Sequence, residues 1–190
     1  MSAGPGSAGS GERLVALLRG ANVGGSSVIK MADLRAAFES LGSTDVVTYI
    51  QSGNVVFRST ERDRERFSAD IEARLATSFG YRGGAVFLFS AEELAEAAVH
   101  NPFEPARLEH EQYCHLMFLS AEPGPDRQRA LLALQGEDYR FAIHDRILYY
   151  AYPREFAGKR RGIDFEKVLG VIGTGRTWKV VNELIRLAAE

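Results

Sequence analysis

The sequence predicts an α+β fold of two ferredoxin-like halves, each with the element order β-α-β-β-α-β and an antiparallel sheet. Three observations predict it. Short apolar runs of strand length alternate with longer stretches in which apolar residues recur every three or four positions. Clusters of turn residues separate neighbouring apolar runs, as they do in hairpins. The order of elements begins again near residue 113, as expected of two related halves.

The chain divides into three predicted segments. Residues 1–11 are rich in Gly, Ser, Ala and Pro and contain no apolar anchor, which predicts a disordered tail. Residues 12–104 are expected to form the N-terminal ferredoxin-like half. Residues 105–190 are expected to form a C-terminal α+β half that ends in a helix and departs from the first half at that end.

The N-terminal half carries four predicted strands and three predicted helices. The strands are expected at residues 14–18, 46–50, 55–57 and 85–89, where apolar and β-branched residues cluster. Apolar residues at helical spacing indicate the first two helices: Met31, Leu34, Phe38 and Leu41 in the first, and Phe67, Ile71, Leu75 and Phe79 in the second.

Local signals mark the ends of these helices. Thr60 is the expected cap of the second helix, and Gly80 stands where a left-handed residue would close it. Ser90 and Glu93 form a capping box that opens the third helix. This helix is expected to end before Asn101, because a proline follows it.

The C-terminal half opens in the same way as the first. Its elements are expected at residues 113–119 (a strand), 126–134 (a helix), 139–143 and 147–150 (a hairpin) and 155–169 (a helix). The parallel then fails, because the glycine-rich run Gly173-Thr174-Gly175-Arg176 replaces a clear final strand before the last helix.

Composition and charge exclude several classes of function. The net charge of −2 argues against a non-specific nucleic-acid binder, although residues 140–190 carry a basic surplus that could face an anion. No apolar run approaches the roughly 20 residues that span a bilayer, and no signal core is seen. Cys114 is the single cysteine, which excludes an internal disulfide. We expect a cytoplasmic protein with no membrane partner, metal or cofactor.

The topology should bring two distant segments to one edge of the first sheet. In a β-α-β-β-α-β half, the loop after the first strand and the hairpin between the next two strands lie at the same end. Residues 19–30 and 51–54 should therefore converge. Glycines in the loop let backbone N–H groups approach a ligand, and the helix N-terminus that follows favours an anion.

This edge carries groups that suit the phosphate or carboxylate of a small molecule. The candidate ligand-binding residues are Arg19, Asn22, Gly24, Gly25, Lys30, Gln51, Ser52 and Asn54. The glycine spacing is neither that of a P-loop nor that of a dinucleotide-binding loop, and residues 51–54 are also typical of an ordinary turn. No nucleophile with a partner base can be identified, so the catalytic residues stay unassigned.

Three motifs closely resemble the bacterial domain-of-unknown-function 1697 family, in the same order. They are LRGANVGG at residues 18–25, KMADLR at residues 30–35 and YIQSGNVVF at residues 49–57. The resemblance covers almost the whole chain after the tail. It implies an α+β fold with ferredoxin-like halves in a cytoplasmic bacterial protein, and it implies no agreed biochemical activity.

The C-terminal half resembles that family less closely. The resemblance adds four candidate binding residues: Tyr152, Lys159, Arg176 and Trp178. Tyr152 lies in a Tyr-x-x-Tyr-Pro strand end, and Lys159 matches a Ser-Lys step in which Gly158 replaces the serine. Arg176 and Trp178 match an Arg-Asn-Trp-Asn-Thr run. Thr177 and Lys179 stand where that run has asparagines.

Other residues have both a chemical and a structural interpretation. His115 lies in a predicted strand and could act as a base near neutral pH, although such histidines are more often structural. Tyr149 and Tyr152 are three positions apart, so on a regular strand one should face the core and one a site. Thr177 can cap the last helix, and Cys114 is expected to be buried.

Three functions compete. The first is a protein that binds, and could act on, an anionic small molecule of phosphorylated or nucleotide-like character at the Gly-rich edge. The second is a protein-interaction module without a small ligand. The third is a single-stranded nucleic-acid binder that would stack bases on Tyr49, Phe57, Tyr149 and Tyr150.

Overall fold

A computed structural model of the chain describes residues 11–22, 28–81, 84–103, 112–136, 139–153 and 162–190. It divides the chain into two units, one of Met1–Glu93 with Leu184–Glu190 and one of Leu94–Glu183. Each unit holds a four-stranded antiparallel sheet. The expected α+β fold with two β-α-β-β-α-β halves is therefore confirmed. Only Gly11 of the predicted tail lies within the described residues.

The first sheet has the strand order β2-β3-β1-β4. Its strands are β1 (Glu12–Leu18), β2 (Thr44–Tyr49), β3 (Asn54–Ser59) and β4 (Val86–Ser90). Because side chains alternate between the two faces of a strand, Leu14, Ala16 and Leu18 of the central β1 share one face. All three are fully buried in the core of this unit.

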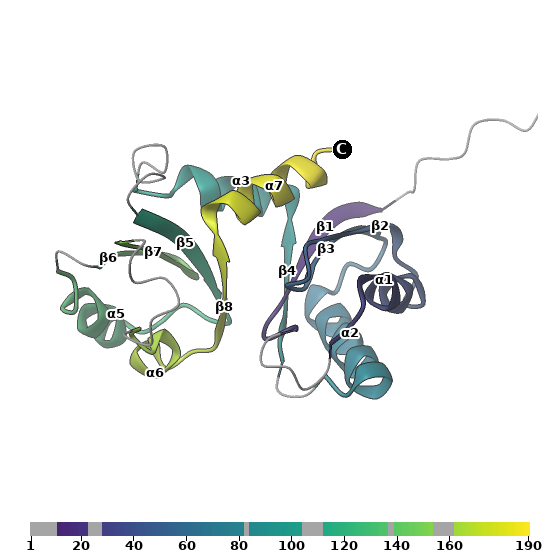
Figure 1. Cartoon of the computed structure of the whole chain (residues 1–190), viewed down its shortest axis with the longest axis horizontal. Coiled ribbons are helices and arrows are strands. Elements are labelled where there is room, and N and C mark those ends of the chain that lie inside the picture. Colours follow the sequence, from purple (N-terminus) through teal and green to yellow (C-terminus); the bar gives the residue numbers. More distant parts are fainter. Residues whose placement is uncertain (1–10, 23–27, 82–83, 104–111, 137–138, 154–161) are drawn as a thin grey trace, which may run out of the picture. The chain divides into compact units, whose positions relative to one another are not determined.

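Two helices cover that face of the first sheet, α1 (Met31–Glu39) and α2 (Arg64–Phe79) (Figure 1). The expected apolar stripes are confirmed, because Leu34 and Phe38 of α1 and Ile71 and Leu75 of α2 are almost completely buried. The ring of Phe38 meets the ring of Phe57 edge-on, with centroids 5.1 Å apart.

The cap of the second helix lies three residues later than expected. Asp63 caps α2 by accepting a hydrogen bond from the backbone N–H of Arg66 at 3.0 Å. The expectation of Thr60 was wrong because the Glu61 carboxylate accepts the N–H groups of Arg62 and Asp63, which bends the chain before the helix starts. Gly80 closes the helix in a left-handed conformation, as expected.

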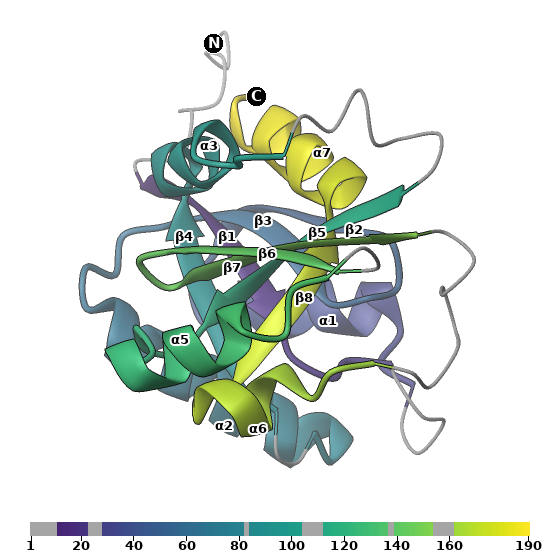
Figure 2. The same ribbon diagram turned by 90° about the vertical axis from the view of Figure 1, so that its left-hand side faces the viewer.

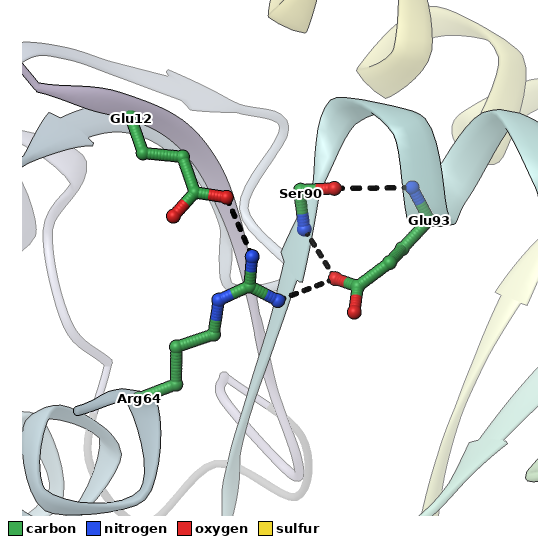
Figure 3. Close-up of polar contacts among 4 residues, drawn as sticks. All are labelled: Glu12, Arg64, Ser90 and Glu93. Carbon is green, nitrogen blue, oxygen red and sulfur yellow. Dashed lines mark hydrogen bonds and ion pairs between the residues drawn. The ribbon is translucent and has the colours of Figure 1, made fainter. Parts of the chain in front are cut away.

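Within this unit an ionic cluster joins the start of β1, the start of α2 and the first turn of the helix that follows β4 (Figure 3). Arg64 donates to Glu12 of β1 at 2.5 Å and to Glu93 of α3 (Ala91–Val99) at 2.6 Å. Glu93 also accepts the N–H of Ser90, and the hydroxyl of Ser90 accepts the N–H of Glu93. The capping box is confirmed, and Arg64 links it to the sheet.

The second sheet has the order β6-β7-β5-β8 and follows the same topology. Its strands are β5 (Gln112–Leu119), β6 (Arg140–His144), β7 (Ile147–Pro153) and β8 (Gly173–Thr177). The helices α5 (Pro125–Leu132) and α6 (Phe165–Leu169) lie side by side on one face (Figure 2). They bury Leu131 and Leu169 against that face.

The expectation that the second half lacks a clear final strand was wrong. Gly173–Thr177 forms β8, which pairs with β5 from His115 to Leu119. A Cβ at Gly173 would lie 2.7 Å from the side chain of Met117 and 2.9 Å from the carbonyl oxygen of Phe118. Glycine therefore permits a close approach of the two strands here and does not mark a loop.

The last two helices both lie where the sequence predicts helices. The helix expected within residues 155–169 is described as α6, which Asp164 caps at Lys167 N–H; residues 154–161 lie outside the described part. The final helix is α7 (Trp178–Ala188). Thr177 caps it by accepting the N–H of Val180 at 3.3 Å, as expected. Among the described residues, no helix has the length and hydropathy of a membrane span.

Candidate functional site

The loop after β1 meets the β2–β3 turn at one edge of the first sheet. The N–H of Leu18 donates to the carbonyl of Gly53 at 2.8 Å. Gly53 has a φ of 70°, and a Cβ there would lie 2.7 Å from the Cβ atoms of both Leu18 and Ala21. A glycine at this position therefore lets the turn lie against the loop. The expected convergence is confirmed for the described residues.

Asn22 holds this loop and turn together. It has a left-handed φ of 58°, which asparagine tolerates better than most residues. Its side-chain amide donates to the carbonyls of Ile29 at 3.1 Å and Gln51 at 2.9 Å, and its Oδ1 accepts the N–H of Ile29 at 2.7 Å. The amide thus bridges both ends of the loop and the neighbouring turn.

Asn54 and Ser52 also serve the internal geometry of the edge. Asn54 is fully buried as the first residue of β3. Its Nδ2 donates to the carbonyl of Tyr49 at 3.1 Å and to the hydroxyl of Ser52 at 2.9 Å. These contacts stabilise the four-residue turn between β2 and β3. Gln51, in contrast, is exposed at the tip of that turn.

The N-terminus of α1 opens at the same edge. Lys30 is the exposed residue that precedes the helix, and among the described residues no side chain caps the first turn. The positive end of the helix dipole and the N–H groups of that turn favour an anion there. Asp33 in the first turn contributes an opposing carboxylate.

Arg19 fixes the other side of the loop through its backbone. Its N–H donates to the carbonyl of Ala85 at 2.8 Å, and its own carbonyl accepts from the Tyr81 hydroxyl at 2.5 Å. The candidate residues Gly24 and Gly25 lie outside the described residues, so the described edge consists of residues 19–22, 28–33 and 50–54.

The candidates in the second unit lie on different faces of its sheet. Tyr152 is half-buried on the face that carries His115. Arg176 pairs with Leu116 of β5, which puts it on the opposite face. It is only 7% exposed, and its guanidinium donates to the Thr174 hydroxyl and the Gly175 carbonyl, each at 2.8 Å.

Two further candidates complete this set. Trp178 is half-buried as the first residue of α7, directly after Thr177. Lys159 lies outside the described residues. Tyr149 is fully buried, so the expectation that one tyrosine of the Tyr149–Tyr152 pair belongs to the core is confirmed.

Sequence reasoning did not find the ring stack around His115. The imidazole lies nearly parallel to the ring of Tyr150 at 4.9 Å and to the ring of Tyr152 at 5.3 Å, between centroids. Burial lowers the pKa of His115 to about 4 and raises that of Tyr150. His115 and Tyr150 are therefore both neutral at physiological pH. The register of β5 against β7 sets His115 opposite Tyr150, and these two strands are not consecutive in the chain.

The described residues contain no group of three or more His, Cys, Asp or Glu side chains arranged to hold a metal ion. Cys114 is buried, as expected, and burial raises the pKa of its thiol.

Comparisons with known proteins place the chain in a family and support its fold. A family model described as "Protein of unknown function (DUF1697)" matches residues 12–149. No curated protein matches the chain. A solved structure, a conserved bacterial protein from Streptococcus pneumoniae, is similar with a TM-score of 0.69 and 22% identity over 93% of this chain and 98% of that chain. At that identity the likeness concerns the fold alone.

Proposed function

Because the chain belongs to the DUF1697 family of unknown function, no activity follows from its membership, and we propose from the site that it binds an anionic small molecule. The binding edge is the N-terminus of α1 with Lys30, flanked by the β2–β3 turn. The observation that carries the proposal is the side-chain amide of Asn22, which ties the start of this helix segment to Gln51.

The proposed anion is a phosphate or a carboxylate. The N–H groups of the first turn of α1 donate to its oxygens, and the Lys30 ammonium supplies the positive charge. Gln51 is exposed at the tip of the turn, and its side-chain amide can donate to a ligand oxygen. Asn22 and Asn54 act as scaffold for these groups, since their amides are engaged with the backbone.

Lys30→Ala tests the charge requirement. Thermal stability should rise with added inorganic phosphate, AMP or a simple dicarboxylate, and Lys30→Ala should weaken the apparent affinity by roughly fivefold, about 1 kcal/mol. Lys167→Ala is the matched control, because Lys167 is an exposed lysine of α6. The proposal fails if none of these anions stabilises the protein or if both variants respond alike.

Asp33→Asn tests the same site in the opposite direction. The carboxylate of Asp33 lies in the first turn of α1, where it competes with an external anion. Removing its charge should strengthen phosphate binding by about threefold. An unchanged or weaker affinity would place the anion elsewhere.

A protein-interaction role is the second candidate, because apolar side chains are exposed at the same edge. Val28 is 67% exposed and Ile50 is 48% exposed. Binding of a protein partner that covers these side chains should be lost in Ile50→Ser and should persist in Lys30→Ala. An anion site predicts the reverse. The single-strand alternative loses support, since its stacking candidates Phe57 and Tyr149 are fully buried.

A further inference from the structure

The face of the second sheet that carries α5 and α6 changes along its strands from closed to open. Near the start of β8 it is closed, because Met117, Leu148 and Gly173 are buried there. Residues two positions apart on a strand share a face. Two positions further along the same face, Gly175 of β8 is exposed and His115 of β5 is only half-buried. The face is therefore accessible at its His115 end.

Three aromatic rings line this accessible end: those of His115, Tyr150 and Tyr152, all half-buried. The rings are nearly parallel, because the three pairs are inclined by only 10°, 12° and 14°. The ring of Phe165 in α6 lies 4.7 Å from that of Tyr150, which closes the helix side of the group. We call the rings of His115, Tyr150 and Tyr152 the aromatic face. Their shared orientation suits a flat molecule that stacks on them.

The aromatic face is matched to an uncharged molecule. Burial lowers the pKa of His115 to about 4 and raises the pKa of Tyr150, so both groups are neutral at physiological pH. An ion placed here would lose hydration without gaining an opposite charge from these two groups. A neutral ring loses much less hydration and gains the stacking contact.

The hydroxyl of Tyr150 supplies a polar contact at this face. A Cβ at Gly175 would lie 3.2 Å from this hydroxyl, so glycine keeps the space beside it open. Within the part of the chain that the structure describes, no group forms a hydrogen bond with the hydroxyl. It is therefore a donor available to a ligand atom that enters beside the exposed Gly175.

We propose that the aromatic face binds a neutral, planar heteroaromatic ring of the nucleobase type. The ring lies parallel to those of His115 and Tyr152, and one of its nitrogen or oxygen atoms accepts a hydrogen bond from the Tyr150 hydroxyl. An aliphatic ligand would forgo the stacking and leave this hydroxyl unpaired. None of these residues belongs to the anion site at the start of α1, so the two proposals can fail independently.

An NMR titration with adenosine tests the proposal on the whole chain. Adenosine should shift the ring ¹H–¹³C signals of His115, Tyr150 and Tyr152 in a saturable way, because a stacked base changes the ring-current field at each of them. Ribose, which has the sugar without the base, should leave these signals in place. The proposal is overturned if adenosine gives no saturable shift or if ribose gives the same one.

Tyr152→Leu tests the stacking contribution. Leucine keeps an apolar side chain on β7 but removes the ring, so the affinity for adenosine should fall about tenfold. Adenosine binding as tight as that of the wild type would show that the aromatic face is part of the core and not a binding site.

Gly175→Ala tests the space beside the Tyr150 hydroxyl and should weaken adenosine binding about fivefold. Gly124→Ala is the matched control, because no atom lies within 4 Å of a Cβ at that position. Tyr150→Phe keeps the ring and removes only the hydroxyl, so it gives the same test without adding an atom to β8. Wild-type affinity in Tyr150→Phe would exclude the proposed hydrogen bond and overturn the assignment to a heteroaromatic ring.

Discussion

The side-chain Nδ2 of Asn22 lies 2.9 Å from the backbone oxygen of Gln51, and this bond joins segments 29 residues apart. The same amide spans its own loop through Ile29. The sequence predicts that Asn22 contacts a ligand, but its side chain instead holds the loop and the turn of the proposed site together. The binding groups are held where they are by hydrogen bonds that a ligand would not need to break.

Asn22→Ala should destabilise the first unit strongly. It removes three hydrogen bonds, and it places alanine at a φ of 58°, a left-handed conformation that alanine tolerates less well than asparagine. The expected loss is about 3 kcal/mol in the free energy of unfolding in urea. Asn182→Ala is the control, because it loses a single exposed bond to Trp178. A loss below about 1 kcal/mol for Asn22→Ala would show that Asn22 does not hold the loop and the turn together.

Ile50→Asn should stabilise the protein. Ile50 has a φ of 48°, which a β-branched side chain disfavours, and it is largely exposed. Asparagine tolerates this conformation, so the expected gain is about 1 kcal/mol. Val47→Asn, at an exposed position of β2, should instead destabilise. If both substitutions destabilise, the turn is not strained at Ile50.

The Arg64–Glu93 pair should show a measurable coupling energy. Arg64 is 32% exposed and Glu93 45%, so solvent screens the pair, and a double-mutant cycle with Arg64→Met and Glu93→Gln should give about 1 kcal/mol. The more exposed Arg66–Asp70 pair at 3.9 Å should give close to zero. Equal couplings would show that Arg64 does not organise the junction of Figure 3.

His115 should make stability fall in mild acid. Burial lowers its pKa from 6.5 to about 4, so the unfolded chain binds the proton more tightly than the folded one. The stability is fully present above pH 6.5 and is lost as the pH falls toward 4, by up to about 3 kcal/mol. His115→Gln should flatten this part of the pH profile. If His115→Gln keeps the wild-type dependence of stability on pH, other titratable groups cause that dependence.

Local sequence signals predicted much of the fold because they act over a few residues. The Ser90–Glu93 capping box, the Gly80 helix end and the Thr177 cap each depend on groups within one turn of the chain. The meeting of the loop after β1 with the β2–β3 turn followed from topology alone. Thr60 failed as a cap because Glu61 competes for the same N–H groups.

Features set by distant partners could not be predicted. Gly173 carries the signal of a loop, and only its closeness to Met117 and Phe118 of β5 shows why a strand needs glycine there. Asn22 and Asn54 are polar residues in turns, typical of binding sites, yet their partners make them scaffold. The burial of Arg176 likewise depends on a register with β5 that its own neighbours do not encode.

The most direct test of the anion site is a two-dimensional ¹H–¹⁵N NMR titration with inorganic phosphate. The account predicts saturable shifts of the backbone amides of Met31, Ala32 and Asp33 at the start of α1, together with Gln51, and their weakening in Lys30→Ala. Shifts spread over exposed lysines such as Lys167, or no saturable shift at the start of α1, would contradict it.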